Sequence, residues 1–313
     1  MTGICGFAGS WLAEELLAHG YTIRGAALPG EPDDNVVHLG RRIRIDRFDI
    51  TNREACRKHI TAARPDYLFH LAAAASVGKS FSMAETTIRV NTLGSYHIFD
   101  AVRDKKWLKK LVFVSTSDVY GSVKAKDLPL KPESPIHPSS PYAQSKAAAE
   151  LIAQVYISRY RLPIVIVRAF NHTGPRQGPD FVISAFSQKI AAAERSRGKA
   201  VIKVGNLAAK RDISDVRDIV RGYRMLAEQG RIGRIYHLCS GKAFSIGRLL
   251  NKLLDLSDKA INVQQDKSLY RTIDIPVLRG SFRATQQEIG WKPEIELQTT
   301  LEDTLNFWRR RAE

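Results

Sequence analysis

The sequence predicts an α/β fold, with a doubly wound parallel Rossmann sheet and a smaller α/β domain. Two patterns in its 313 residues lead to this prediction. Short apolar runs rich in branched side chains alternate with longer segments of helical period, as in a parallel sheet covered on both faces. Gly3, Gly6 and Gly9 are spaced as a tight turn that opens a helix, and the backbone amides of such a turn receive a pyrophosphate.

The expected elements follow one another in the order that this fold requires. Each strand is a short apolar run, and each helix fills an interval between two strands. The strands are expected at residues 22–26, 44–48, 67–71, 110–115, 164–168 and 235–239, and the helices at residues 10–18, 53–63, 86–102, 141–160 and 216–228.

From about Phe170 the pattern becomes irregular. Gly, Pro and Asn clusters interrupt it, and a helix is expected at residues 182–194. We read the late segments as a second, substrate-binding domain that shares a tight interface with the first, because no flexible linker separates them. The expected division is residues 1–168 plus about 215–243 for the dinucleotide-binding domain, and about 169–214 plus 244–313 for the second domain.

The first strand of the sheet is expected to be missing or truncated in this sequence. The glycine turn normally follows a buried strand at the centre of the sheet, and here only Met1 and Thr2 precede Gly3. Either the assigned start lies downstream of the real one, or the sheet forms without its middle strand. The first alternative is favoured, because loss of a central strand leaves the backbone groups of its neighbours without partners.

The composition argues against several classes of protein. The net charge of +16 comes from small scattered basic groups without interleaved aromatic residues, which predicts a solvated basic surface and no nucleic-acid partner. Cys5, Cys56 and Cys239 are too far apart for a disulfide framework or a metal site, which indicates a reducing compartment. No apolar run approaches the ~20 residues that span a bilayer, so we expect a cytoplasmic protein with no membrane partner.

Tyr142 and Lys146 stand four residues apart in an expected helix, and therefore share one face of it. A free phenol, with a pKa near ~10, is a poor acid or base at neutral pH. An adjacent ammonium stabilises the phenolate and is expected to lower that pKa toward the working range. The pair predicts proton transfer in the chemistry of carbonyls and alcohols.

The sequence leaves the choice between NADH and NADPH open. The end of the second expected strand, over residues 24–28, carries neither the acidic residue that takes ribose hydroxyls nor an arginine placed for the extra phosphate. Residues that could take either role follow nearby in the sequence: Asp33 and Asp34 for the ribose hydroxyls, and Arg41 and Arg42 for the extra phosphate. Asp49 and Ile50, after the next strand, suit a position near the adenine amino group.

Several further motifs appear in a fixed order along the chain. They are His70-Leu71-Ala72-Ala73, Asn91 with Gly94, Ser115-Thr116-Ser117 and Arg168 to Pro175. Together with the glycine turn and the Tyr142–Lys146 pair, they make the chain similar to the extended short-chain dehydrogenase/reductase (NAD-dependent epimerase/dehydratase) family, which modifies nucleotide sugars. Later segments resemble the branch that handles GDP-linked 6-deoxyhexoses, namely residues 204–207, 211–212, 218–220, 271–280 and 290–293.

The resemblance implies roles for individual residues. Tyr142 would be the general acid for the sugar O4, Thr116 would hold the same oxygen, and Lys146 would tune the phenol while binding the nicotinamide ribose. The implied contacts of NADP or NAD are Gly3, Gly6, Phe7, Gly9, Asp49, Ile50, Leu71, Ala72, Ala73, Asn91, Tyr142 and Lys146. The implied substrate contacts are Asn171, Val182, Lys189, Val204, Asn206, Arg211, Arg271 and Asp274, with the arginines on phosphate oxygens. His172 is read as a hydrogen-bonded structural residue.

Asp118 bears on the type of reaction. Relatives that remove water across C5 and C6 normally have Glu as a base at this position, and Asp is one methylene shorter, which near-attack geometry tolerates poorly. We therefore expect reduction of the C4 keto group of a GDP-4-keto-6-deoxyhexose, giving GDP-D-rhamnose or its C4 epimer, with Asp118 as an accessory group. Dehydration of GDP-mannose, 4-epimerisation and non-catalytic dinucleotide binding stay as alternatives. A homodimer through the helices at residues 86–102 and 141–160 is expected.

Overall fold

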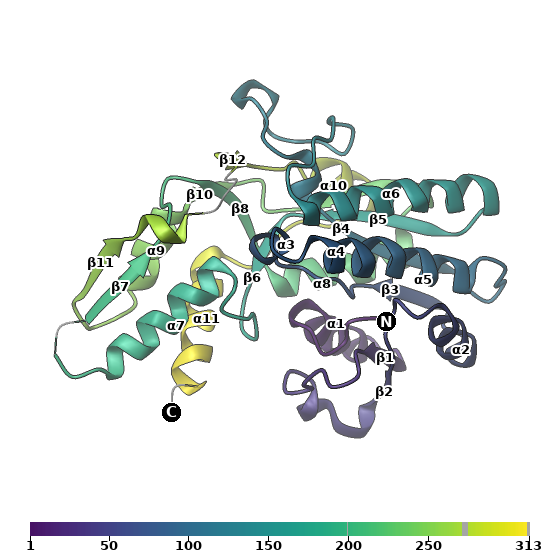
Figure 1. The fold of residues 1–313 in the computed structure, drawn as a ribbon, viewed down its shortest axis with the longest axis horizontal. Helices are drawn as coiled ribbons and strands as arrows, with labels where there is room; N and C mark the ends of the chain where they lie inside the picture. The colour runs from purple at the N-terminus through teal and green to yellow at the C-terminus, as the bar shows by residue number, and fades with distance from the viewer. Residues whose placement is uncertain (199, 271–274, 312–313) are drawn as a thin grey trace.

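The computed structural model describes residues 1–198, 200–270 and 275–311. It contains the predicted parallel sheet, with helices on both faces (Figure 1). Four strands form its larger part, in the order β3 (Tyr67–His70), β4 (Lys110–Thr116), β5 (Ile164–Ala169) and β9 (Ile235–Leu238). The smaller part is the parallel pair β1 (Ile23–Ala27) and β2 (Ile43–Arg47). The predicted doubly wound fold is confirmed.

Thr2, the second residue of the chain, connects these two parts of the sheet. Thr2 forms a parallel bridge with Ala26 of β1 on one side and with His70 of β3 on the other. It therefore occupies the central position that a first strand would have, as the sequence led us to expect. Among the described residues, nothing else lies between β1 and β3 as a paired strand.

Helices pack on both faces of the sheet and bury two apolar clusters. The cluster under α1 and α8 includes Leu12, Ile23 and Val220, and the cluster under α2, α5 and α6 includes Ile60, Leu68 and others. The helices of these layers are α1 (Phe7–Ala18), α2 (Arg53–Ala63), α3 (Val77–Ser80), α4 (Ala84–Ile88), α5 (Gly94–Val102), α6 (Pro141–Tyr160), α8 (Val216–Gln229) and α10 (Arg283–Ile289).

The single helix expected at residues 86–102 is wrong in one respect. The structure divides it into α4, a π-helical turn at Arg89–Leu93, and α5. Such a turn widens the helix by one residue and is common at functional sites. Here it directs the buried Asn91 toward the backbone of Ala74 rather than along the helix surface.

The later segments form a smaller lobe beside the sheet, at the left in Figure 1. Its apolar core lies between α7, α9, α11 and the strand pair β7–β11. Its elements are β6 (Asn171–Thr173), α7 (Val182–Arg195), β7 (Ala200–Val204), β8 (Lys210–Asp215), β10 (Ala243–Ser245), α9 (Ile246–Leu254), β11 (Ile261–Gln265), β12 (Val277–Leu278) and α11 (Leu297–Arg311). The exact division into two domains stays a prediction. In the part of the chain that is described, no helix is long and apolar enough to cross a membrane.

Candidate active site

The glycine turn is built so that only glycine fits. Gly3 has a φ of +71°, and a Cβ there would lie 2.9 Å from the amide nitrogen of Ala72. A Cβ on Gly9 would lie 1.9 Å from the carbonyl oxygen of Gly3. The turn leads directly into α1, whose N-cap Gly6 makes no side-chain capping bond. Its backbone amides are therefore available to an anionic group at the positive end of the helix.

The segment after β3 closes over this turn. The hydroxyl of Thr2 accepts a hydrogen bond from the Ala72 amide at 3.1 Å and lies 2.8 Å from Nδ1 of His70. Asn91 holds Ala74, two residues further along the chain, because its Oδ1 accepts from the Ala74 amide at 2.8 Å. Its Nδ2 donates to Ser145 Oγ at 2.9 Å. Asn91 thereby connects the loop after β3 to the helix that carries Tyr142.

These contacts gather much of the predicted cofactor set at the carboxyl ends of β1 and β3. Phe7 belongs to the same surface, since its ring stacks on His172 with centroids 5.9 Å apart. Asp49 instead accepts from the amide of Thr51 at 2.8 Å in the turn after β2. Ile50 is buried against Gly94, where a Cβ would come within 2.7 Å of its Cδ1. Their contacts with a dinucleotide stay predictions.

The candidate catalytic side chains meet where β4 ends and α6 begins. Thr116 is the last residue of β4, while Ser140 caps α6 through the Ala143 amide and Pro141 starts its first turn, a sequence signal for a helix start. Tyr142 is 8% exposed and Lys146 3% exposed. The Lys146 ammonium lies 5.0 Å from the centroid of the Phe113 ring.

The pKa of the phenol differs from the sequence prediction. Burial raises the pKa of Tyr142 above its ordinary value, the charge of Asp118 raises it further, and a hydrogen bond from Thr116 opposes both. We expected a lowered pKa, but removal of the phenolate from water outweighs the stabilising contacts. Tyr142 is therefore a protonated phenol at neutral pH, which is the form that donates a proton.

Lys146 shifts in the opposite direction. Burial lowers the pKa of its ammonium to about 8, and the carboxylate of Glu150 partly opposes this change. The group is still mainly cationic at pH 7 and loses its charge just above that range. A buried ammonium with this pKa is sensitive to any change in the charge of its neighbours.

A buried polar network lies behind this pair and was not predicted. Glu150 forms an ion pair with Arg168, whose Nη2 donates to its Oε2 at 2.7 Å, and it also accepts a hydrogen bond from Ser115 at 2.5 Å. Arg168 Nη1 donates to the hydroxyl of Tyr120 at 2.7 Å. Glu150 follows Lys146 by four residues on the same helix, and this spacing was the signal available in the sequence.

Asp118 is fixed by Thr116, which lies two residues before it. Its Oδ2 accepts a hydrogen bond from the Thr116 hydroxyl at 2.9 Å, and its amide donates back to Thr116 Oγ1 at 3.1 Å. This small loop begins a short 3₁₀ helix at Ser117–Tyr120. The carboxylate is thus fixed beside Thr116 by a reciprocal pair of hydrogen bonds.

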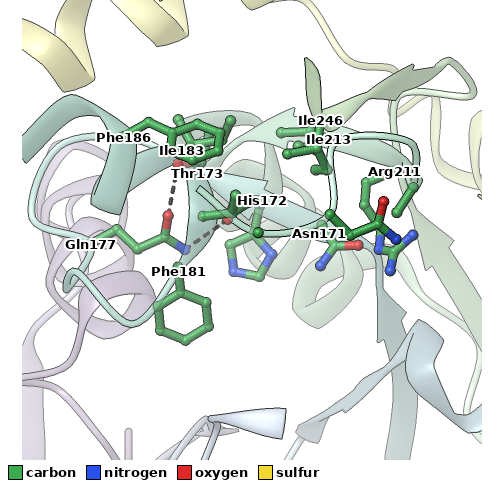
Figure 2. Close-up of a pocket in the computed structure, with 14 residues that line it drawn as sticks. Asn171, His172, Thr173, Gln177, Phe181, Ile183, Phe186, Arg211, Ile213 and Ile246 are labelled. Carbon is green, nitrogen blue, oxygen red and sulfur yellow. Dashed lines mark hydrogen bonds between the residues drawn. The ribbon is translucent and has the colours of Figure 1, made fainter. Parts of the chain in front are cut away.

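A cavity of about 140 Å³ opens between β6, α7 and β8 (Figure 2). Four of the predicted substrate residues line it, namely Asn171, Val182, Asn206 and Arg211. Two others are placed elsewhere. Lys189 donates from Nζ to the carbonyl oxygen of Lys203 at 2.6 Å, and Val204 is buried in the core of the smaller lobe. Arg271 and Asp274 lie outside the described residues.

The cavity also contains residues that the sequence did not predict. Gln177 is fixed by Thr173 Oγ1 at 2.7 Å and donates to the carbonyl oxygen of His172 at 3.0 Å, as Figure 2 shows. Phe181 and Phe186 supply apolar walls. His172 Nδ1 lies 2.9 Å from the Phe170 carbonyl oxygen, and burial lowers the pKa of the ring. Gln177 and Phe181 lie between β6 and α7, where no periodic pattern marks the residues that reach the cavity.

The parallel sheet, the glycine turn and the tyrosine–lysine pair define a protein of the epimerase/dehydratase class of short-chain dehydrogenases/reductases. Comparison with known proteins makes this more specific. The chain belongs to the family whose model is described as GDP-mannose 4,6 dehydratase, which matches residues 1–304.

Individual relatives carry two different activities in their names. GDP-6-deoxy-D-mannose reductase of Pseudomonas aeruginosa is 32% identical over 248 residues, which cover 79% of this chain and 82% of the relative. GDP-mannose 4,6 dehydratase of Cricetulus griseus is 27% identical, over 94% of this chain and 87% of the relative. A solved structure described as RMD from Pseudomonas aeruginosa complexed with NADPH has a TM-score of 0.85 at 28% identity, covering 99% of this chain and 97% of that one.

Proposed function

We propose that the protein reduces the C4 keto group of a GDP-4-keto-6-deoxyhexose with NADPH or NADH, giving GDP-D-rhamnose or its C4 epimer. The observation that carries the proposal is the buried phenol of Tyr142, which lies beside Thr116 at the carboxyl end of β4 and on the same helix as Lys146. A ketone reduction consumes one proton at the carbonyl oxygen, and a phenol below its pKa is the form that can donate this proton. The reductase relative from Pseudomonas aeruginosa supports the same reaction.

Different residues of the site would bind the cofactor, transfer the proton and stabilise the charge that develops in this reaction. The glycine turn and the segment after β3 would hold the dinucleotide, with its pyrophosphate at the start of α1. The bound nicotinamide supplies a hydride to C4. Tyr142 gives its proton to O4, and the Lys146 cation stabilises the phenolate left behind. The Thr116 hydroxyl, which donates to Asp118 in this structure, would turn to donate to O4 when the substrate binds.

The cavity between β6, α7 and β8 is the proposed place for the nucleotide part of the substrate. Asn171 and Arg211 line it with polar groups suited to a diphosphate. Arg211 Nη1 also donates to the carbonyl oxygen of Ile275 at 2.6 Å, which fixes the orientation of the guanidinium. The names of the relatives support guanine as the base.

Dehydration of GDP-mannose is the second candidate, and the family description favours it. Abstraction of a proton from C5 requires a carboxylate that reaches over the sugar ring. Asp118 is short, and its Oδ2 is held 2.9 Å from the Thr116 hydroxyl. Because a displacement of about 1 Å can cost a hundredfold in rate, this arrangement supports reduction over dehydration.

The test is an incubation of the protein with a GDP-4-keto-6-deoxyhexose and reduced nicotinamide, followed by the absorbance of the reduced cofactor. We expect substrate-dependent oxidation with at least one of NADPH and NADH. No oxidation with either would contradict the proposal. Conversion of GDP-mannose without net use of cofactor would establish the dehydratase instead, and interconversion of two ordinary nucleotide sugars would establish an epimerase. Dinucleotide binding without any turnover would indicate a binding protein.

We further propose that two copies associate through α4, the π-helical turn and α6. Ile88, Leu93, Leu151 and Val155 are 41–58% exposed on these elements, and α4 and the turn both pack against α6. An exposed group of aliphatic side chains of this kind is typical of a subunit interface. Light scattering should give twice the monomer mass for the natural chain and the monomer mass for Leu151→Glu. A monomeric natural chain would contradict this.

A further inference from the structure

The chain between β6 and α7 crosses from one helical layer of the sheet to the other. Residues 174–181, which we call the strap, contact α1 near their beginning and α3 near their end. α1 packs against α8 on one face of the sheet, and α3 packs against α6 on the other face. In Figure 1, both α1 and α3 lie at the side of the sheet that faces the smaller lobe. The strap therefore passes over the carboxyl edge of the sheet.

The beginning of the strap is held on α1 by several contacts. Trp11 donates from Nε1 to the carbonyl oxygen of Pro175 at 3.0 Å, and the Arg176 guanidinium lies 4.2 Å from the centroid of the Trp11 ring. Arg176 Nη2 also donates to Glu14 Oε1 at 2.6 Å. The backbone of Arg176 has a φ of +76°, a conformation that residues with side chains disfavour. Such a conformation persists where the surrounding contacts impose it, so this end of the strap is firmly fixed.

The end of the strap is held on α3 by an exposed ion pair. Lys79 Nζ donates to Asp180 Oδ2 at 2.5 Å, and the two side chains are 61% and 48% exposed. A surface ion pair of this kind contributes little to stability and is easily broken. Gly178 lies between the two ends, and a Cβ there would meet no atom within 4 Å. The strap is therefore fixed on α1 and weakly attached on α3.

The two ends of the strap flank the proposed cofactor site. α1 follows the glycine turn, and α3 follows the loop after β3 that closes over this turn. Arg176 Nη1 reaches Ser10 Oγ at 3.4 Å, so the strap begins within one helical turn of the amides that would receive a pyrophosphate. β3 lies between the glycine turn and β4, and Tyr142 lies at the end of β4. A dinucleotide that reaches from the glycine turn to Tyr142 must therefore pass beneath the strap.

We propose that the strap closes over the bound dinucleotide and opens at the Lys79–Asp180 ion pair to let the cofactor enter and leave. This inference rests on the proposed function, because it takes the dinucleotide to bind at the glycine turn. Opening requires loss of the exposed ion pair and rotation of the backbone at Gly178, a residue type that tolerates such rotation. Gln177, just before it, stays fixed by Thr173. Because the pair must break before the cofactor leaves, it slows release.

A simpler role for Lys79 gives a different expectation. If its ammonium only attracted the phosphates of the dinucleotide, the nearby carboxylate of Asp180 would weaken that attraction. Neutralising Asp180 would then slow the release of the cofactor. In a strap that opens at the ion pair, neutralising either partner frees the segment and speeds release. The Asp180 variant therefore separates the two roles.

The rate of cofactor release tests the proposal. The full chain is loaded with NADPH or NADH, excess oxidised cofactor is added in a stopped-flow instrument, and the fluorescence of the reduced cofactor is followed. Lys79→Gln and Asp180→Asn should each release the cofactor about threefold faster than the natural chain. The double variant should also be about threefold faster, because both changes remove the same interaction. Exchanging the charges, with Lys79→Asp and Asp180→Lys together, should return the rate to near that of the natural chain.

Lys109→Gln is the matched control. Lys109 forms an ion pair with Asp66 in which the side chains are 65% and 64% exposed, and it precedes β4 at the opposite edge of the sheet. This variant should release the cofactor at the rate of the natural chain. Slower release from Asp180→Asn, unchanged release from both single variants, or additive effects in the double variant would overturn the strap and leave the proposed function standing. A natural chain that binds neither dinucleotide would overturn both.

Discussion

The two halves of the sheet differ in how completely they are packed. Around β4 and β5, strands pair along their full length, and the buried charges of Glu150 and Arg168 satisfy one another. Between β1 and β3, two strand edges face a cavity of about 460 Å³, and among the described residues the bridges that connect them are those of Thr2. The difference indicates that packing is most complete under the proposed catalytic groups, while the glycine turn is attached at the less completely packed half.

The largest expected effect, on the rate of the reaction, lies in the half of the sheet around β4 and β5. Replacing Tyr142 by Phe removes the proton donor and should lower the rate of ketone reduction by roughly a thousandfold. Binding of the reduced cofactor, measured by fluorescence, should be nearly unchanged. Tyr156→Phe is the matched control, since Tyr156 lies on the same helix and contacts Asp100. Equal rates for the Tyr142 variant and the control would contradict the assignment.

A matched pair of truncations compares the packing of the two halves directly. Leu68 and Leu111 are partners across β3 and β4 and belong to one apolar cluster, but of the two only Leu68 lines the cavity between β1 and β3. Leu111→Ala should cost about 4 kcal/mol in the free energy of unfolding, and Leu68→Ala about 2 kcal/mol, because Leu68 already faces empty space. Urea unfolding measures both values. A larger loss in the free energy of unfolding for Leu68→Ala than for Leu111→Ala would show that the residues around the cavity between β1 and β3 are well packed.

The buried ion pair between Glu150 and Arg168 is expected to stabilise the half of the sheet around β4 and β5 by an amount comparable to that of the Leu111 side chain. Glu150→Gln leaves the Arg168 guanidinium buried without its carboxylate, and we expect a loss of about 3 kcal/mol in the free energy of unfolding. Arg53→Gln is the control, because the Arg53–Asp100 ion pair lies at the surface, where such pairs contribute little. If both substitutions lower the free energy of unfolding by the same amount, the Glu150 network does not stabilise the half of the sheet around β4 and β5.

The smallest expected effect is on the pH dependence. Lys146 must be cationic to stabilise the phenolate, and burial lowers its pKa to about 8. Values of kcat/KM should therefore be constant below this pH and fall as pH rises through it. Because Glu150 raises the pKa of Lys146, the fall should begin at lower pH in Glu150→Gln. An alkaline limb that does not move in this variant would contradict the link between the two residues.

The sequence was sufficient for the positions along the chain of the six strands of the Rossmann sheet and for the glycine turn, because both depend on local patterns. The start of α6 is also local, since Ser140 and Pro141 mark it. The π-helical turn could not be predicted, because it depends on the contact of Asn91 with Ala74 across the fold. The direction of the Tyr142 pKa was wrong for a related reason, since burial is a property of the whole structure.

The substrate residues show the same limit. Asn171, Val182, Asn206 and Arg211 surround one cavity as predicted, although their contacts with a nucleotide stay a prediction. Lys189 and Val204 have side chains of suitable chemistry, but their strand and helix direct them to other partners. Gln177 and Phe181 reach the cavity through turns, where the side-chain direction follows from no simple period.

Transfer of deuterium from a labelled reduced nicotinamide tests the central claim most directly. A GDP-4-keto-6-deoxyhexose is incubated with the protein and the labelled cofactor, and the product is analysed by mass spectrometry and proton NMR. A reductase places one deuterium at C4 of the sugar and none elsewhere. A product without deuterium, or no product while GDP-mannose is converted under the same conditions, would contradict the claim that the protein reduces the keto group.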